Sequence, residues 1–338
     1  MDAIKKLANE IGENFGGPAQ KLSTHQFTLD EAPDLSGKVA VVTGGSEGIG
    51  YGATHTFLKH NIHKLYILSV SPEVVSGARE AIAKELGQEV ADRTVWKQCD
   101  MADWKKVKEV AEEIKKDTDR LDILVNNAGR GIMTYQETEY GLDRHMAVNH
   151  FGSVLLTSSL LPLLKKTAEQ GNTVRVTVQS SNLHHSAPSD TKFESLEELN
   201  RDLGPNPQYG RSKLAGILYA RWFARNVTNA GHPKLLMNAT HPGIVHTKQS
   251  KEDIHEPYPL AGYGMSVGMA PFKKNQFEGA VSTVYAATVI DRSGQYINPP
   301  AVPEEGSDQS QDEKLGDNLM ALTRKIYKEK TGEDLVVS

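Results

Sequence analysis

The chain has 338 residues, of which 24% are charged and 38% hydrophobic, and its 38 basic and 43 acidic side chains give a net charge of -5. This composition is typical of a globular protein with a sizeable core, and it excludes the strongly basic balance of a nucleic-acid-binding protein. Cys99 is the single cysteine, so neither an intramolecular disulfide nor a multi-cysteine zinc site can form.

The N-terminal region predicts an extension that precedes the main domain. Residues 1–37 combine an amphipathic helical pattern, which reaches about Phe15, with a polar stretch that follows it. The first residues lack the apolar core of a secretory signal, and no run of about 18 apolar residues follows. We therefore expect a cytoplasmic protein without a membrane span.

From Lys38 onward, short β-branched runs alternate with amphipathic helical patterns. This alternation predicts βαβ units and a doubly wound α/β domain, with a parallel sheet covered on both faces, over residues 38–338. The clearest helix is WKKVKEVAEEIKK, and its apolar side consists of Trp104, Val107, Val110, Ala111 and Ile114. About seven strands are expected, in VAVVTG, KLYIL, TVWKQ, DILVNNAG, VRVTV, KLLMNAT and GQYIN.

Two long segments interrupt the alternation, at about residues 182–208 and 249–277. Loops of this length in a compact domain are usually functional or disordered, and both follow strands whose carboxyl ends are expected to bind ligands. We interpret them as substrate lids. The first contains a short amphipathic pattern around Phe193 and Leu199, which either covers the substrate or packs locally.

A glycine-rich turn, TGGSEGIG, joins the first predicted strand to the next helix. Its glycines Gly44, Gly48 and Gly50 would let the backbone approach a pyrophosphate closely. The helix N-terminus would add unpaired N–H groups and a partial positive charge. A purely structural turn is the alternative.

Four further motifs follow this turn in order: NNAG, a serine pair after the fifth strand, YxxxK at Tyr209 and Lys213, and HPG. From about Lys38 to Asn298 this order resembles the short-chain dehydrogenase/reductase family. The stretch MAVNHFGSVLLTSSLLPLL and the wide gap between serine and tyrosine are most similar to retinol dehydrogenase-like members.

The resemblance implies a Rossmann-like fold and an NAD(P)-dependent oxidoreductase. Its expected reaction interconverts a secondary alcohol and a ketone, or an aldehyde, on an apolar small molecule. The alternative is the same fold used for non-redox chemistry or as a cofactor-binding regulator, since fold does not dictate reaction.

The resemblance also implies which residues bind the cofactor. An acid after the second strand would hold the adenosine ribose and an arginine a 2′-phosphate, but Ser69 and Val70 stand in these places. The carboxylate of Glu47 would repel a phosphate, which favours NAD, while serine hydroxyls leave NADP open. Besides Tyr209 and Lys213, the implied set is Gly44, Ser46, Glu47, Gly48, Ile49, Gly50, Ser69, Asp100, Met101, Asn127, Ala128, Gly129, Pro242, Gly243, Ile244 and Thr247.

Tyr209 and Lys213 lie one helical turn apart, and this spacing points to acid/base chemistry. A free phenol has a pKa of about 10, and a neighbouring ammonium lowers it by stabilising the phenolate. The resemblance implies that Ser181, rather than Ser180, hydrogen-bonds the substrate oxygen. It also implies that Asn149 anchors a water in the proton path, with a structural role at a helix bend as the alternative.

The remaining patterns point to no further cofactor. The twelve histidines show no HExxH spacing, so no metal is expected, and His184 or His185 is a candidate for substrate contact. In the family that the chain resembles, the helices of Asn149 and Tyr209 form the dimer surface. A homodimer is therefore one expectation, and a terminal addition that covers this surface is the alternative.

Overall fold

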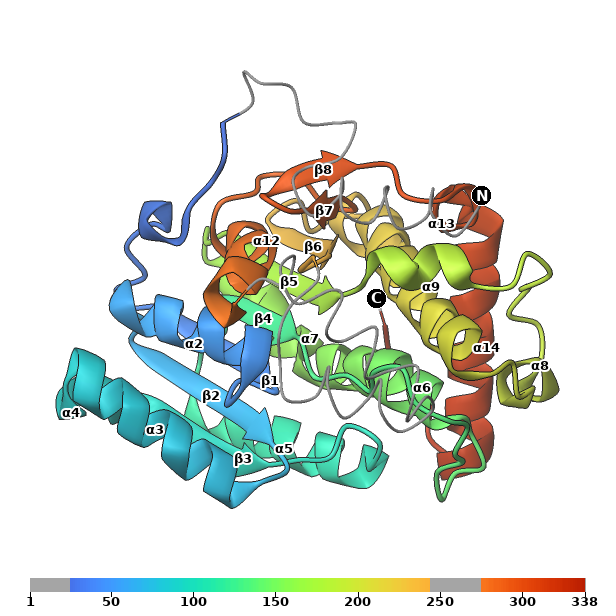
Figure 1. Ribbon diagram of the computed structural model, residues 1–338, viewed down its shortest axis with the longest axis horizontal. Coiled ribbons are helices and arrows are strands. Elements are labelled where there is room, and N and C mark those ends of the chain that lie inside the picture. Colours follow the sequence, from blue (N-terminus) through green and yellow to red (C-terminus); the bar gives the residue numbers. More distant parts are fainter. Residues whose placement is uncertain (1–24, 244–274, 338) are drawn as a thin grey trace, which may run out of the picture.

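The centre of the fold is one eight-stranded sheet, in a computed structural model that describes residues 25–243 and 275–337. The strands are β1 (Val39–Thr43), β2 (Lys64–Ser69), β3 (Thr94–Gln98), β4 (Ile123–Asn126), β5 (Val174–Gln179), β6 (Leu235–Thr240), β7 (Tyr296–Asn298) and β8 (Val302–Glu304). Their order is β3-β2-β1-β4-β5-β6-β7-β8, and neighbours run parallel except β7 and β8. The order reverses between β1 and β4, which confirms the doubly wound α/β fold (Figure 1).

All seven expected strands are present, and β8 is one that the sequence did not predict. It has three residues, with Pro303 in the middle. Proline cannot donate a ladder hydrogen bond, so it weakens a strand pattern and is tolerated mainly at a sheet edge. Among the residues that the structure describes, β8 pairs with β7 alone, so it is such an edge strand.

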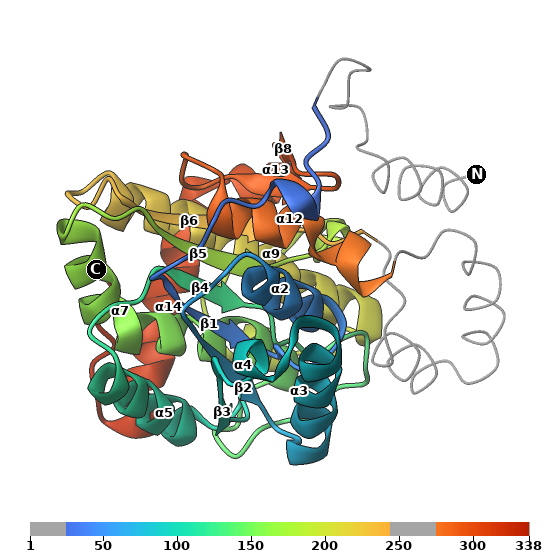
Figure 2. The same cartoon turned by 90° about the vertical axis from the view of Figure 1, so that its left-hand side faces the viewer.

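Helices cover both faces of the sheet (Figures 1 and 2). The α-helices are α2 (Gly48–Lys59), α3 (Pro72–Leu86), α4 (Gln88–Ala91), α5 (Trp104–Asp117), α6 (Arg144–Met146), α7 (Ser153–Glu169), α8 (Leu196–Asn200), α9 (Pro205–Phe223), α12 (Gln276–Thr288), α13 (Asp308–Gln311) and α14 (Glu313–Thr331). The 3-10 helices are η1 (Leu29–Glu31) and η3 (Asn182–Ser186), and the π-helices are η2 (Ala147–Gly152) and η4 (Ala224–Thr228).

The buried side chains of β1 alternate between two cores, as the period of a strand requires. Val39 and Val41 belong to the core that contains α5, α7 and α9. Ala40 and Val42 belong to the core that contains α2, α3 and α12. The stripe expected on α5 is confirmed, since its buried residues are Trp104, Val107, Val110, Ala111 and Ile114.

The later part of the N-terminal extension packs on the domain. Phe27 and Leu35 are buried in the core that contains α2 and α12, and the Phe27 ring centroid lies 5.3 Å from that of Tyr285. The helix expected up to Phe15 lies outside the described residues. The domain boundary at residue 37 stays a prediction.

The two expected lids differ from their predicted outlines. The first contains η3, α8 and the start of α9, which begins at Pro205. Phe193 and Leu199 are buried in the main core, so this part packs locally rather than over a ligand. Most of the second lid lies outside the described residues. Its last residues start α12, where the Asn275 side chain accepts two backbone N–H groups at 2.9 Å.

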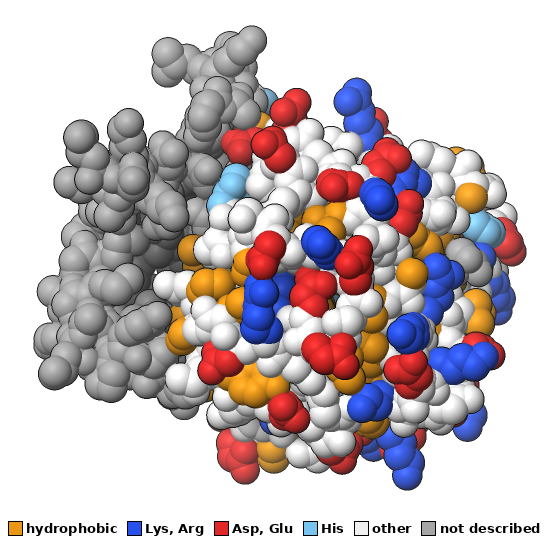
Figure 3. All heavy atoms as spheres, turned by 90° about the vertical axis from the view of Figure 1, so that its right-hand side faces the viewer, with side chains coloured by type: hydrophobic (Ala, Val, Ile, Leu, Met, Phe, Trp, Pro, Cys, Tyr) orange, Lys and Arg blue, Asp and Glu red, His pale blue; other side chains and the backbone are white. Residues whose placement is uncertain are grey.

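The C-terminal helix α14 packs on α9, one of the helices expected to form a dimer surface. The homodimer, and the alternative in which a terminal addition covers its surface, both stay predictions. Figure 3 shows the side of the molecule that includes α14, where acidic and basic side chains are mixed without a large patch of one sign.

A buried histidine joins α14 to η2. The His150 Nε2 atom lies 2.8 Å from Thr323 Oγ1. The Thr323 hydroxyl donates its own proton to the Leu319 carbonyl, so Nε2 carries the hydrogen that Thr323 accepts. Burial lowers the pKa of His150 to about 3, which keeps the ring neutral in the folded chain.

We predict that His150 makes the fold sensitive to acid. Because its pKa is lower in the folded chain than the value of about 6.5 in the unfolded chain, the unfolded chain binds the extra proton as the pH falls below about 6.5. Between about pH 7 and pH 5 this costs the folded state about 2 kcal/mol. Urea unfolding at both pH values should therefore show that the free energy of unfolding falls less between pH 7 and pH 5 for His150→Leu than for the wild type. An equal loss in both would contradict the prediction.

We also predict that Gly50 is required for stability. A Cβ atom at this position would overlap the Gly44 carbonyl oxygen and lie 2.5 Å from Asn127 Nδ2, whereas at Gly77 in α3 it would meet nothing within 4 Å. Gly50→Ala should lower the free energy of unfolding by about 1–3 kcal/mol. Gly77→Ala, the matched control, should leave it unchanged or raise it by up to about 1 kcal/mol. Equal values for both variants in denaturant unfolding would refute this account of the turn.

Candidate active site

The glycine turn and the NNAG motif meet at the point where the strand order reverses. Gly44 and Gly48 have φ angles of 62° and 53°, which favour glycine. The Thr43 hydroxyl accepts the backbone N–H groups of Asn127 and Ala128, both at 2.9 Å, and the Asn127 side chain donates to the Thr43 carbonyl at 3.0 Å. The carboxyl ends of β1 and β4 are thus joined where ligands bind in such sheets. The sequence did not single out Thr43.

Two serine hydroxyls meet beside this turn. Ser46 Oγ lies 2.9 Å from Ser69 Oγ at the end of β2, and both residues are buried. Glu47, between Ser46 and the start of α2, is exposed. Val70 follows Ser69 and is 56% exposed. Ile49 packs against the core that contains α2.

The end of β3 is held by a contact that the sequence did not reveal. The Asp100 carboxylate accepts the Ala102 backbone N–H at 2.8 Å and pairs with Arg144 of α6 at 3.0 Å. Met101 is buried, and its carbonyl lies so close to Gly152 that a Cβ atom there would overlap it. Asp100 is therefore fixed at the same sheet edge as the glycine turn.

Tyr209 and Lys213 lie on α9, one turn apart. Lys213 Nζ lies 5.3 Å from the centroid of the Tyr209 ring and donates a 2.9 Å hydrogen bond to the carbonyl of Gln179, the last residue of β5. A Cβ atom at Gly129 would lie 3.3 Å from Lys213 Nζ. The ammonium is therefore confined between the end of β5, Gly129 and the tyrosine ring, and Lys213 is only 5% exposed.

Asn149 lies on the π-helix η2, and its side chain joins two other parts of the site. Its Nδ2 donates to the Arg130 carbonyl at 3.0 Å and to Ser212 Oγ at 2.8 Å. Its Oδ1 accepts the Arg130 backbone N–H at 2.7 Å. Ser212 in turn donates to the Tyr209 carbonyl at 2.7 Å. The structural role that the sequence left open is present, on a type of helix that is frequent at functional sites.

The two adjacent serines after β5 have different surroundings. Ser180 Oγ donates to the Lys213 carbonyl at 2.8 Å, so its hydroxyl is used to fix α9. Ser181 Oγ accepts the Leu183 backbone N–H at 3.2 Å and caps η3. This difference favours Ser181 as the substrate-binding serine, a role that stays a prediction.

The histidine and HPG predictions have mixed outcomes. His184 is 0% exposed and His185 is exposed, so His185 is the accessible one of the two candidates for substrate contact, a role that stays a prediction. Pro242 and Gly243 are partly buried after β6, and the Gly243 φ angle is 79°. Ile244 and Thr247 lie outside the described residues.

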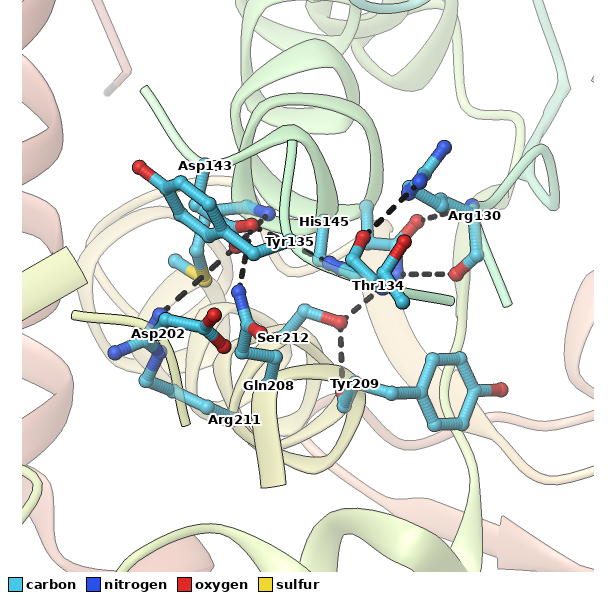
Figure 4. Close-up of polar contacts among 12 residues, drawn as sticks. Arg130, Thr134, Tyr135, Asp143, His145, Asp202, Gln208, Tyr209, Arg211 and Ser212 are labelled. Carbon is cyan, nitrogen blue, oxygen red and sulfur yellow. Dashed lines mark hydrogen bonds and ion pairs between the residues drawn. The ribbon is translucent and has the colours of Figure 1, made fainter. Parts of the chain in front are cut away.

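A buried polar cluster holds α9 in place and was not predicted. Arg211, 1% exposed, donates to the carbonyls of Glu198 and Leu199 in α8 at 2.6 and 2.5 Å. The Asp143 carboxylate lies 3.9 Å from Arg211 and accepts a 3.1 Å hydrogen bond from Gln208 (Figure 4). Gln208, the residue before Tyr209, is thus held by the N-cap residue of α6, while Arg211 ties the same helix to α8. No periodic pattern identifies such residues.

Two further findings concern metals and membranes. Within residues 25–243 and 275–337, no group of three or more His, Cys, Asp or Glu side chains could hold a metal ion. In the same part of the chain, one helix, Arg144–Glu169, is long and apolar enough to cross a membrane, but 83% of its most apolar window is buried inside the protein. Core helices share this property.

Known proteins resemble this chain over most of its length. The family model for short chain dehydrogenases matches residues 38–189. A mitochondrial candidate oxidoreductase of Neurospora crassa, bli-4, is 62% identical over 332 residues, which cover 97% of this chain and 81% of the relative. Retinol dehydrogenase 14 of Mus musculus is 31% identical over 280 residues, which cover 77% of this chain and 76% of the relative.

The expected cytoplasmic location is wrong, because the Neurospora relative is named as mitochondrial. The prediction relied on the missing apolar core of a secretory signal. Mitochondrial targeting segments are amphipathic rather than apolar, so the missing apolar core excludes only a secretory signal.

Solved structures share the fold. RhlG of Pseudomonas aeruginosa, solved in complex with NADP, has a TM-score of 0.58 and 22% identity, over 81% of this chain and 97% of that chain. The relatives with higher sequence identity also show the family and the class of reaction. The chain belongs to the short-chain dehydrogenase/reductase family and is an NAD(P)-dependent oxidoreductase.

Proposed function

We propose that the chain interconverts an alcohol and a ketone or aldehyde on an apolar small molecule, with Tyr209 as the acid/base. The observation that carries this proposal is the ammonium of Lys213, 5.3 Å from the Tyr209 ring centroid and anchored on the Gln179 carbonyl. A cation at this distance stabilises the phenolate more than the phenol. The tyrosine can then exchange a proton with a substrate oxygen near neutral pH.

The chain's own residues supply the proton and the positioning. In the direction of reduction, Tyr209 gives its hydroxyl proton to the carbonyl oxygen while Ser181 donates a hydrogen bond to the same oxygen. Lys213 stabilises the phenolate that remains, and a water held near Asn149 returns the proton. When bound, the nicotinamide supplies or accepts the hydride.

The cofactor would lie along the carboxyl edge of the sheet, against the glycine turn, the NNAG motif and the ends of β2 and β3. Two features of the turn fit a dinucleotide. Gly50 leaves no room for a Cβ atom, so the backbone of the turn is closely packed. The helix α2 begins in this turn, and its N-terminal N–H groups would be available to the pyrophosphate. The exposed Glu47 carboxylate would repel a 2′-phosphate, so we propose NAD as the preferred form. The Ser46 and Ser69 hydroxyls would bind the ribose.

Apolar alcohols and their carbonyl forms are the proposed substrate class. The name of the murine relative, retinol dehydrogenase 14, describes such a substrate for that protein. A non-redox role on the same fold is the competing function. It predicts no change in the absorbance of the reduced nicotinamide during turnover, whereas the proposed reaction predicts one equivalent per product.

Replacing Tyr209 by phenylalanine should remove the proton donor and keep the fold. We predict that Tyr209→Phe lowers kcat by about 100- to 10,000-fold, while the dinucleotide Kd changes by less than about threefold. Steady-state kinetics and fluorescence titration measure the two quantities. Tyr285→Phe is the matched control, because Tyr285 packs against Phe27 and should keep full activity. Unchanged turnover in Tyr209→Phe would refute the mechanism.

Reversing the charge at Glu47 should change the cofactor preference. Glu47→Lys replaces a repulsion of the 2′-phosphate by an attraction, so kcat/KM for NADPH relative to NADH should rise about tenfold. The exposed Glu80→Lys in α3 carries the same charge change as a control and should leave the ratio unchanged. Assays with both cofactors on a panel of apolar ketones and aldehydes test this. If Glu47→Lys and Glu80→Lys give the same ratio of kcat/KM for NADPH to kcat/KM for NADH, Glu47 does not lie at the cofactor site.

A further inference from the structure

A buried histidine connects Ser181 to the C-terminal part of the chain. His184 lies in η3, and its side chain is 0% exposed. Its Nδ1 lies 2.8 Å from the Ser181 carbonyl oxygen, and its Nε2 lies 3.0 Å from the backbone nitrogen of Ser307. The ring thus bridges two segments that are far apart in the sequence.

The two partners determine where the proton of His184 lies. The Ser307 backbone N–H can only donate, so Nε2 accepts. The remaining proton is on Nδ1, which donates to the Ser181 carbonyl, an acceptor only. Burial lowers the pKa of the ring to about 3, so this neutral form persists at working pH. The ring is packed between His185 and Tyr296, with centroids 4.1 and 5.2 Å away.

Hydrogen bonds hold both the carbonyl and the hydroxyl of Ser181, the candidate substrate-binding serine. The Ser181 carbonyl also accepts the backbone N–H of His184 at 3.1 Å, and the Ser181 hydroxyl accepts that of Leu183 at 3.2 Å. Removal of the ring would leave the Ser181 carbonyl with only the backbone N–H of His184 as its hydrogen-bond donor among these contacts. The position of the serine hydroxyl therefore depends on the histidine.

The other end of the bridge returns to the helix that carries Tyr209. Arg221 of α9 donates to the carbonyls of Glu305 and Ser310, each at 2.6 Å, on either side of Ser307. Ser310 Oγ donates to the Ser307 carbonyl at 2.6 Å. A chain of contacts therefore runs from Ser181 through His184, Ser307 and Ser310 to Arg221 of α9. These contacts connect Ser181 to the helix of Tyr209 through residues 305–310. That segment lies outside the region that the family model matches.

We propose that His184 is a positioning residue, whose Nδ1–H holds Ser181 in place and whose contact with Ser307 ties the serine to α9. The proposal rests on the proposed function, in which Ser181 and Tyr209 act on the same substrate oxygen. His184 itself contacts neither substrate nor cofactor. It acts by fixing the distance and angle between the hydroxyl groups of Ser181 and Tyr209.

Two amide variants separate the two halves of the bridge. Asparagine places its amide near the position of Nδ1 and glutamine places it near Nε2, whereas alanine removes both contacts. With retinal and NADH or NADPH as probes, His184→Ala should lower kcat between about 10- and 100-fold with little change in KM. His184→Asn, which keeps the contact with the Ser181 carbonyl, should recover more of the loss than His184→Gln, which keeps only the contact with Ser307. Neither should reach the wild-type kcat, because each lacks one half of the bridge. His232→Ala, outside the site, should behave as the wild type.

A double-mutant cycle tests whether His184 acts through Ser181. If it does, His184→Ala should cost less than about twofold in a Ser181→Ala background. Additive losses would overturn the proposal, and so would rescue by glutamine instead of asparagine. Full activity of Ser181→Ala alone would instead overturn the assigned role of the serine.

Hydrogen exchange provides a readout that needs no turnover. The amides of Leu183 and His184 are bonded to Ser181, so they should exchange at least about tenfold faster in His184→Ala and His184→Gln, and at the wild-type rate in His184→Asn. Mass spectrometry of the peptide that contains them measures this in the full chain. Unchanged exchange in all three variants would contradict the positioning role even if retinal is not turned over.

Discussion

The proposed chemistry depends on the fixed position of one ammonium group. Lys213 is anchored on the carbonyl at the end of β5 and lies 5.3 Å from the Tyr209 ring. A cation held this close to a phenol favours the charged phenolate over the neutral form. The parallel sheet matters because it brings the end of β5 and the ends of β1 and β4 to one edge. The proposed proton donor and the proposed dinucleotide site therefore share that edge.

The contacts behind these groups come from distant parts of the chain. Asn149 joins the segment after β4 to α9, and the Asp143 and Arg211 cluster fixes the residue before Tyr209. The C-terminal segment contributes Ser307 and the helix α14. Buried polar groups that bond to several elements favour one arrangement, because an alternative arrangement would break those hydrogen bonds. Such a support suits a reaction that depends on the relative positions of a serine and a tyrosine.

The sequence predicted the parts of the fold that have a period or a motif. The seven strands, the apolar side of α5 and the order of motifs at the sheet edge follow from alternation, helical spacing and the glycines of the turn. β8 was missed because a three-residue strand around Pro303 carries no alternation. Thr43, Asp143 and His184 act through long-range hydrogen bonds, which no local pattern reveals. The cytoplasmic location was wrong because it rested on excluding one kind of targeting segment.

The ionisation of Tyr209 tests the central claim most directly. Ultraviolet difference titration of the full chain with dinucleotide bound, compared with the same titration of Tyr209→Phe, isolates the signal of this phenol. The proposed role of Lys213 predicts that the pKa of this phenol lies clearly below the value of about 10 for a free tyrosine. A pKa of about 10 with the dinucleotide bound would contradict the role of Lys213, and failure to bind any dinucleotide would contradict the account as a whole.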